Sequence, residues 1–170
     1  MSTPPCTTPR DWRYLMLKRT CTLLGVPYFR PQVVFTAPLP AEGFIVACNH
    51  VTLLDWAAIA YALPRPVRFL ITRDYYDRRA CNWFCRLGGA IPVRSRGIEL
   101  SATRSAIAAL ERGEILGIFP EGALSHNGRM QPFQRGVTQL AMRTQCPVIP
   151  ATIRGAFEAF PSQRSFPRPR

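Results

Sequence analysis

The sequence predicts an α/β fold: a largely parallel sheet flanked by helices, with an N-terminal amphipathic helix ahead of it. Two apolar runs, FIVAC at Phe44–Cys48 and ILGIF at Ile115–Phe119, have the length and composition of strands buried on both faces. Helical patterns of about ten to fifteen residues separate the expected strands. Strands and helices that alternate in this way favour right-handed βαβ crossovers within one sheet.

The N-terminal region precedes this alternation. Residues 1–10 are rich in proline and threonine, and we expect them to be loose. The segment Asp11–Leu24 mixes apolar residues with Arg13, Lys18 and Arg19, which indicates a basic amphipathic helix. It is shorter and more charged than the roughly 20 apolar residues that a membrane-spanning helix needs. Such a helix can lie on a membrane surface or pack over the protein's own core, and the sequence leaves both open.

The remaining elements follow with little connecting chain. Pro64 stops one helical pattern, and glycines at 88–89 and 113 follow two others. A polar loop is expected from Pro120 to Arg135. The expected strands are Val33–Thr36, Phe44–Cys48, Val67–Thr72, Ala90–Val93, Ile115–Phe119 and Val148–Ile153, and the expected helices are Thr52–Leu63, Asp77–Leu87, Ile98–Arg112 and Gly136–Thr144. Binding groups in such a fold gather beyond the carboxyl ends of the strands, so we expect a functional site at that edge of the sheet.

Length and charge restrict the class of protein. A chain of 170 residues suits one domain with one core. Lys and Arg number 22 against 10 Asp and Glu, a net charge of +12 that attracts phosphates, acidic lipids or nucleic acid. The same charge can also reflect only an arginine-rich composition. The arginines are spread along the chain and no nucleic-acid-binding motif is present, so no nucleic-acid partner is expected.

The six cysteines indicate free thiols in a reducing compartment. Cys81 and Cys85 lie one helical turn apart, but no second Cys/His pair completes a four-ligand zinc set. We therefore expect no metal site.

A histidine and an aspartate follow the Phe44–Cys48 run in the segment NHVTLLD. Side chains five positions apart do not face each other on one helix, but a turn at His50 lets the imidazole fold back over the first helical turn. Asp55 can then accept the Nδ1 proton and leave Nε2 free to take a proton from a hydroxyl. The alternative is a helix cap and an unrelated surface charge.

The segment FPEGALS follows the second buried run in the same way. Pro120-Glu121-Gly122 can be only a turn, because proline and glycine suit turn conformations. A second polar loop at the same edge of one sheet makes a shared site the stronger interpretation.

These two segments resemble known motifs. NHVTLLD is similar to the NHxxxxD motif, and FPEGALS to the FPEGTRS motif, of the glycerolipid acyltransferase family typified by 1-acyl-sn-glycerol-3-phosphate acyltransferase. The segments GAIPVR at 89–94 and CPVIPA at 146–151 resemble the family's second and fourth blocks. Four blocks in the right order cover most of the chain.

The resemblance implies a role for each matching residue. His50 would be the general base and Asp55 its orienting partner. Glu121 and Gly122 would contact the glycerol phosphate region of the acceptor. The remaining implied contacts are arginines, with Arg94 or Arg96 on the phosphate and Arg73 where the family often has a lysine.

One departure from the family pattern concerns the acceptor. Ala123 and Leu124 stand where the family has Thr-Arg, which removes a hydroxyl and a cation. Either the acceptor is not a phosphomonoester, or other arginines hold its phosphate. The candidates are Arg94, Arg96, Arg129 and Arg135.

The resemblance implies transfer of a fatty acyl group from acyl-CoA or acyl carrier protein, as co-substrate, to the free hydroxyl of a lysophospholipid, with no further cofactor. The first acceptor considered is 1-acyl-sn-glycerol-3-phosphate; another lysolipid such as a lyso-aminolipid, or lipid binding without turnover, is the alternative. Peripheral association with the cytoplasmic face of a membrane is expected. The expected divisions are 1–32 for the N-terminus and docking helix, 33–160 for the acyltransferase domain, and 161–170 for a Pro/Arg-rich tail, with truncation at that tail as one interpretation.

Overall fold

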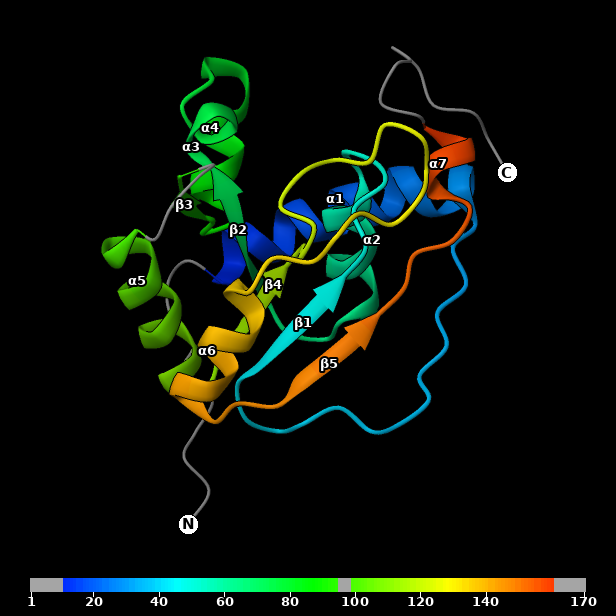
Figure 1. The fold of residues 1–170 in the computed structure, drawn as a ribbon. Helices are drawn as coiled ribbons and strands as arrows, with labels where there is room; N and C mark the ends of the chain where they lie inside the picture. The colour runs from blue at the N-terminus through cyan, green and yellow to red at the C-terminus, as the bar shows by residue number, and fades with distance from the viewer. Residues whose placement is uncertain (1–10, 95–98, 161–170) are drawn as a thin grey trace.

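A computed structural model describes residues 11–94 and 99–160. Their five strands form one sheet in the order β3-β2-β4-β1-β5, with every neighbouring pair parallel (Figure 1). The strands are β1 (Phe44–Cys48), β2 (Val67–Thr72), β3 (Ile91–Val93), β4 (Ile115–Ile118) and β5 (Val148–Ala151). The helices are α1 (Asp11–Phe29), α2 (Asp55–Ala62), α3 (Arg73–Tyr76), α4 (Arg79–Leu87), α5 (Leu100–Glu111), α6 (Gly136–Thr144) and α7 (Ala156–Ala159). The α/β fold with a parallel sheet flanked by helices is confirmed.

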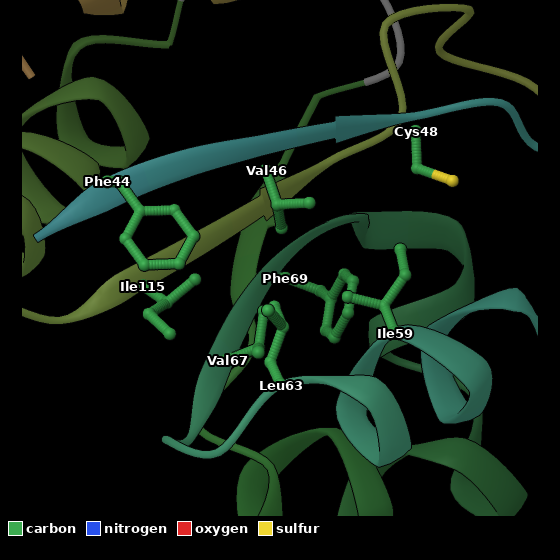
Figure 2. Close-up of a cluster of buried hydrophobic side chains, with 8 residues drawn as sticks. All are labelled: Phe44, Val46, Cys48, Ile59, Leu63, Val67, Phe69 and Ile115. Carbon is green, nitrogen blue, oxygen red and sulfur yellow. The ribbon is translucent and has the colours of Figure 1, made fainter. Parts of the chain in front are cut away.

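The sheet has a core on each face because successive strand residues point to opposite sides. On one face Phe44, Val46 and Cys48 of β1 pack with Ile59 of α2 and with Leu63, the residue after that helix (Figure 2). On the other face α5 and α6 cover a second cluster. The central strands β1 and β4 are therefore buried on both sides, as their continuous apolar runs predicted.

The expected strand Val33–Thr36 is wrong. No strand lies between α1 and β1, and Val34 is 83% exposed. Prolines at 31, 38 and 40 surround this short run, and proline lacks the N–H that a sheet ladder requires. Four β-favouring residues in that context remain an exposed loop.

Several helix boundaries differ from the expectation: α1 runs past Leu24 to Phe29, α5 runs from Leu100 to Glu111, and two further helices begin later than expected. The helix expected from Thr52 begins at Asp55, because the Thr52 hydroxyl accepts the Leu54 N–H at 2.7 Å and holds the chain in a turn. The helix expected at Asp77–Leu87 begins at Arg79, and the short α3 precedes it. Both differences lie at the carboxyl edge of the sheet, where side chains compete for backbone groups.

The N-terminal helix is present and packs through one side. The Tyr14 hydroxyl accepts the Val67 N–H at 3.3 Å, and Lys18 donates to the Leu63 carbonyl at 2.5 Å. Apolar side chains also stand on its outer side, and the exposed ones are Trp12, Leu15, Met16, Leu23, Leu24 and Tyr28. Apolar residues thus occupy both the packed side and the outer side of the helix. None of the described helices combines the length and apolarity needed to cross a bilayer.

Candidate active site

His50 and Asp55 meet in the turn between β1 and α2. The Nδ1 atom of His50 lies 3.0 Å from Oδ2 of Asp55. The His50 side chain is 20% exposed, whereas the Asp55 side chain is fully buried. The five-position spacing works because the chain turns before α2 begins, so the expected contact is present.

Asp55 organises this turn through a single oxygen. Besides the imidazole, Oδ2 accepts the N–H of Val51 at 2.6 Å and the N–H of Thr52 at 2.8 Å. Three groups that converge on one carboxylate oxygen fix its position. The carboxylate also lies in the first turn of α2, where the helix dipole favours negative charge.

Asn49 fastens the end of β1 to the chain that follows β5. Its side-chain amide donates to the Ile153 carbonyl at 3.1 Å and accepts the Ile153 N–H at 2.8 Å. These two bonds extend the hydrogen bonding between the two chain segments beyond Cys48 and Ala151, the last paired residues of β1 and β5. Asn49, the residue before His50, is therefore held in place by the segment that follows β5.

Phe119 supports the imidazole ring directly. The rings of His50 and Phe119 are nearly parallel, with centroids 4.0 Å apart. Phe119 in turn lies parallel to Phe69 at 5.7 Å. Space for Phe69 comes from Gly117 on the adjacent strand, because a Cβ at Gly117 would overlap the Phe69 ring. The stack therefore extends from a strand glycine to the imidazole.

Glu121 connects the loop after β4 to the backbone of His50. One carboxylate oxygen accepts the His50 N–H at 2.9 Å, and the other accepts the Gln131 N–H at 2.9 Å. The Ser125 N–H donates to the His50 carbonyl at 2.9 Å, so both backbone groups of His50 are held. Glu121 is only 5% exposed. Adjacent parallel strands β1 and β4 end side by side, which is why these two loops meet.

Gly122 follows in a left-handed conformation with φ of 67°. A Cβ there would overlap the side-chain amide of Gln134, which donates to the Glu121 carbonyl at 3.4 Å. Gln134 also donates its backbone N–H to the Pro120 carbonyl at 2.8 Å. Glycine is required at this position because backbone and side chain leave no room for another residue.

An apolar cavity of about 570 Å³ opens beside this site. His50, Phe119 and Gly122 line it at one end. Its walls include residues from α1, α2, β2 and α4, among them Tyr14, Trp56, Val67, Phe69, Cys81 and Phe84. Since Val67 begins β2 and Thr72 ends it, and both line the cavity, the space runs along the length of that strand.

The predicted arginines lie in different surroundings. Arg94 lines the cavity. Arg73 pairs with Glu99 at 2.6 Å, and this bond raises the pKa of Arg73 and lowers the pKa of Glu99. The structure brings Arg73 into contact with Glu99 at the start of α5, and Arg73 itself is not among the residues that line the cavity, although its neighbour Thr72 is. Arg96 lies outside the described residues.

Sequence reasoning gave no role to Asn49, Phe119, Gly117 and Ser125. Asn49 begins the NHVTLLD segment and Phe119 begins the FPEGALS segment, so their positions in these motifs already indicated a role at the site. Gly117 inside a buried strand is also a recognised sign of close approach by another group. Ser125 is fully buried and donates to the Arg129 carbonyl at 2.7 Å, and its place at the end of the FPEGALS segment was a signal of the same kind.

Comparisons with known proteins find similar sequences and a similar fold. The family model described as Acyltransferase matches residues 30–154. A 1-acyl-sn-glycerol-3-phosphate acyltransferase from Bacillus subtilis (strain 168) is 29% identical over 69% of this chain and 59% of its own length. The alpha form of the same named enzyme from Mus musculus is 30% identical over 74% of this chain and 45% of its own length.

A solved structure is similar over most of the chain. The crystal structure of the 1-acyl-sn-glycerophosphate (LPA) acyltransferase PlsC from Thermotoga maritima matches with a TM-score of 0.70 and 26% identity, covering 94% of this chain and 64% of that one. The chain thus spans about half the length of the curated relatives that it matches and less than two thirds of the solved one. The family match, the relatives and the fold agree, and the chain belongs to the Acyltransferase family.

Proposed function

We propose that this chain transfers a fatty acyl group from a thioester to the free hydroxyl of a lysophospholipid, with 1-acyl-sn-glycerol-3-phosphate as the first acceptor to test. The observation that carries the proposal is an imidazole paired with a buried carboxylate and opening into an apolar cavity. The relatives' names supply the acceptor and the reaction class. Acyl-CoA and acyl carrier protein remain the two proposed donors.

In this mechanism His50 acts as general base. Oδ2 of Asp55 already accepts two backbone N–H groups, so it serves as an acceptor for the imidazole as well. Nδ1 then carries the proton, and Nε2 is free to accept one. As the acceptor hydroxyl attacks the acyl carbonyl, its proton passes to Nε2. The C–S bond of the thioester breaks, and the departing thiolate takes the proton from the imidazolium.

The acyl chain has a natural place in this proposal. The cavity beside His50 is lined mainly by apolar and aromatic side chains, which suit a hydrocarbon chain. An acyl carbon at the His50 end would leave the chain lying along β2. A β-strand of this length extends about 17 Å, from a rise of about 3.3 Å per residue.

The acceptor's polar end would lie at the same end of the cavity. Arg94 follows β3, Gly122 follows β4, and both line the cavity, so a phosphate near Arg94 would meet a cation. Arg96 and Arg73 remain proposed contacts, with Arg73 having to leave Glu99 to act as one. Both oxygens of Glu121 are engaged by backbone N–H groups, which favours a supporting role for that carboxylate. Leu124 also lines the cavity, which favours testing acceptors without a phosphomonoester.

Peripheral association with the cytoplasmic face of a membrane is part of the proposal. The outer side of α1 exposes Trp12, Leu15 and Met16 next to the basic residues Arg13 and Arg19. Apolar side chains can enter the interface while each nearby cation contributes about 1 kcal/mol with acidic lipid. Lipid substrates would then reach the cavity from the surface on which they reside.

The central experiment compares wild type with His50→Ala and Asp55→Asn. Each protein receives 1-acyl-sn-glycerol-3-phosphate and a labelled acyl thioester of CoA or of carrier protein. Removing a general base lowers the rate by at least about a hundredfold. His126→Ala is the matched control, because His126 is an exposed histidine outside the cavity lining.

Two results would count against the proposal. Equal rates in wild type and His50→Ala would remove His50 as base. Binding of the lysolipid without product in any protein, with either donor, would replace transfer by binding alone.

A further inference from the structure

The loop between β4 and α6 presents an apolar and basic surface to solvent. Met130 and Phe133 are each 60% exposed. Arg129 and Arg135 are exposed on either side of them. We call these four side chains the Met130–Phe133 surface. Residues 126–135 contain two arginines and no Asp or Glu, so the surface is basic as well as apolar.

This surface belongs to a loop that is hydrogen-bonded to buried groups. The Gln131 N–H, between Met130 and Phe133, donates to the buried Glu121 carboxylate at 2.9 Å. The buried Ser125 hydroxyl holds the Arg129 carbonyl at 2.7 Å. Met130 and Phe133 are therefore held outward by the fold itself. An ordered pair of large apolar side chains next to cations is typical of an interaction surface.

The same loop lines part of the cavity. Glu121, which holds Gln131, also holds the backbone of His50. Gln134, the neighbour of Phe133, lines the cavity together with His50. In Figure 1 the loop (yellow) arches across the side of the sheet to which the strand arrowheads point. Whatever binds the Met130–Phe133 surface therefore binds a loop that lines the cavity.

We infer that the Met130–Phe133 surface docks on a bilayer that contains anionic phospholipid. In a bilayer the headgroup phosphates lie directly above the hydrocarbon layer. Arg129 and Arg135 can therefore bind phosphates while Met130 and Phe133 enter the apolar layer. An acidic protein would satisfy the arginines but would leave the two exposed apolar side chains without an equivalent apolar layer. The inference rests on the proposed membrane association and adds a second contact, separate from α1, on a loop that lines the cavity.

The test measures vesicle binding without any acyl donor. The 170-residue wild-type chain and its Met130→Ser/Phe133→Ser variant are sedimented with vesicles of phosphatidylcholine alone or mixed with phosphatidylglycerol. The double variant should bind mixed vesicles about tenfold more weakly, because two apolar side chains no longer enter the interface. Met142→Ser is the matched control, since Met142 is 70% exposed on α6, and it should bind as wild type does.

The arginines test the charge component. Arg129→Gln/Arg135→Gln should weaken binding to the mixed vesicles by about tenfold and leave the weak binding to phosphatidylcholine unchanged. Added salt should remove the difference between this variant and wild type. Circular dichroism should be unchanged for all variants, since every substituted side chain is exposed.

Three results would overturn the inference. The first is wild-type vesicle binding by Met130→Ser/Phe133→Ser. The second is unchanged vesicle binding with slower transfer from an acidic carrier protein, which would make the surface a protein-docking site. The third is equal loss in Met142→Ser. Failure of the proposed function is distinguished separately, because it appears as absent acyl transfer by a wild-type protein that still binds vesicles.

Discussion

The imidazole of His50 lies against the phenyl ring of Phe119, with 4.0 Å between centroids and 13° between ring planes. The neighbouring Asp55 fixes one edge of the imidazole, and Phe119 fixes one face. Two constraints of different kinds therefore define the ring's orientation. A general base whose nitrogen must meet a substrate hydroxyl depends on that orientation.

Replacing Phe119 should slow acyl transfer without unfolding the protein. Phe119→Leu removes the stacked ring, and an aromatic pair contributes about 1 kcal/mol, so we expect kcat to fall about fivefold with KM nearly unchanged. Phe119→Tyr keeps the ring and should retain most of the activity. Steady-state kinetics with a labelled acyl thioester measures both variants. Phe35→Leu makes the same change at an exposed loop position and should have no effect. An unchanged kcat in Phe119→Leu would show that Asp55 alone is sufficient to orient the imidazole.

Glu121 should act as a brace for His50. In Glu121→Gln the side-chain amide keeps one acceptor oxygen, so one of the two bound backbone N–H groups loses its partner. A charged hydrogen bond lost in a buried setting lowers the free energy of unfolding by about 2 kcal/mol. We expect that loss in denaturant unfolding, together with a lower kcat.

The control for Glu121 is Glu111→Gln, which changes an exposed glutamate on α5 and should leave both measurements unchanged. A different combination of stability, kcat and KM would indicate that Glu121 contacts the lysolipid acceptor. If Glu121→Gln keeps full stability and kcat but raises KM for the lysolipid, the carboxylate contacts substrate, as the family resemblance implies.

The sequence predicted the parts of the molecule that a local pattern encodes. Phe44–Cys48 and Val67–Thr72 are strands with the expected bounds, because β-rich apolar runs between turns have few other stable arrangements. Gly136–Thr144 is likewise the helix expected. Val33–Thr36 failed because strand formation needs a partner edge, which four residues cannot reveal.

The contacts of the site also fall into two kinds, local contacts that the sequence predicts and long-range contacts that it does not. His50 and Asp55 are close in sequence and contact through a local turn, so the contact could be predicted. The bonds from Glu121 to His50 and from Asn49 to Ile153 join residues 71 and 104 positions apart. Such contacts depend on strand order, and the insertion of β4 between β1 and β2 is a property of the whole fold.

Gly117 should be intolerant of the smallest side chain. A Cβ in Gly117→Ala would overlap the Phe69 ring, which is packed between Gly117 and Phe119. Overpacking of this kind costs about 1–3 kcal/mol, which thermal unfolding measures as a lower Tm. Gly136→Ala is the matched control, because no other heavy atom lies within 4 Å of a Cβ there and alanine favours helix. Equal Tm values for Gly117→Ala and wild type would mean that Phe69 can move aside freely.

Alkaline pH should destabilise the fold partly through Cys48. Burial, reinforced by the negative charge of Asp55, raises the pKa of the Cys48 thiol from about 9 to about 12. Between these values the unfolded chain releases the proton while the folded chain keeps it. The free energy of unfolding therefore falls as pH rises from about 9 towards 12, with a slope from this thiol of at most about 1.4 kcal/mol per pH unit. Below the unfolded-state value Cys48 contributes no pH dependence.

Denaturant unfolding of wild type and Cys48→Ala across this range isolates the contribution. Cys48→Ala loses some stability at every pH because it removes a buried side chain, but that loss is constant and leaves the slope as the diagnostic quantity. Tyr14, whose pKa burial also raises, titrates in the same direction in both proteins and cancels in the comparison. The two curves should converge as pH rises above 9, because wild type alone loses the thiol's contribution. If the unfolding free energies of the two proteins instead change in parallel up to pH 11, the Cys48 thiol ionises as easily in the folded protein as in the unfolded chain. Water would then reach the Cys48 side chain next to the NHVTLLD turn.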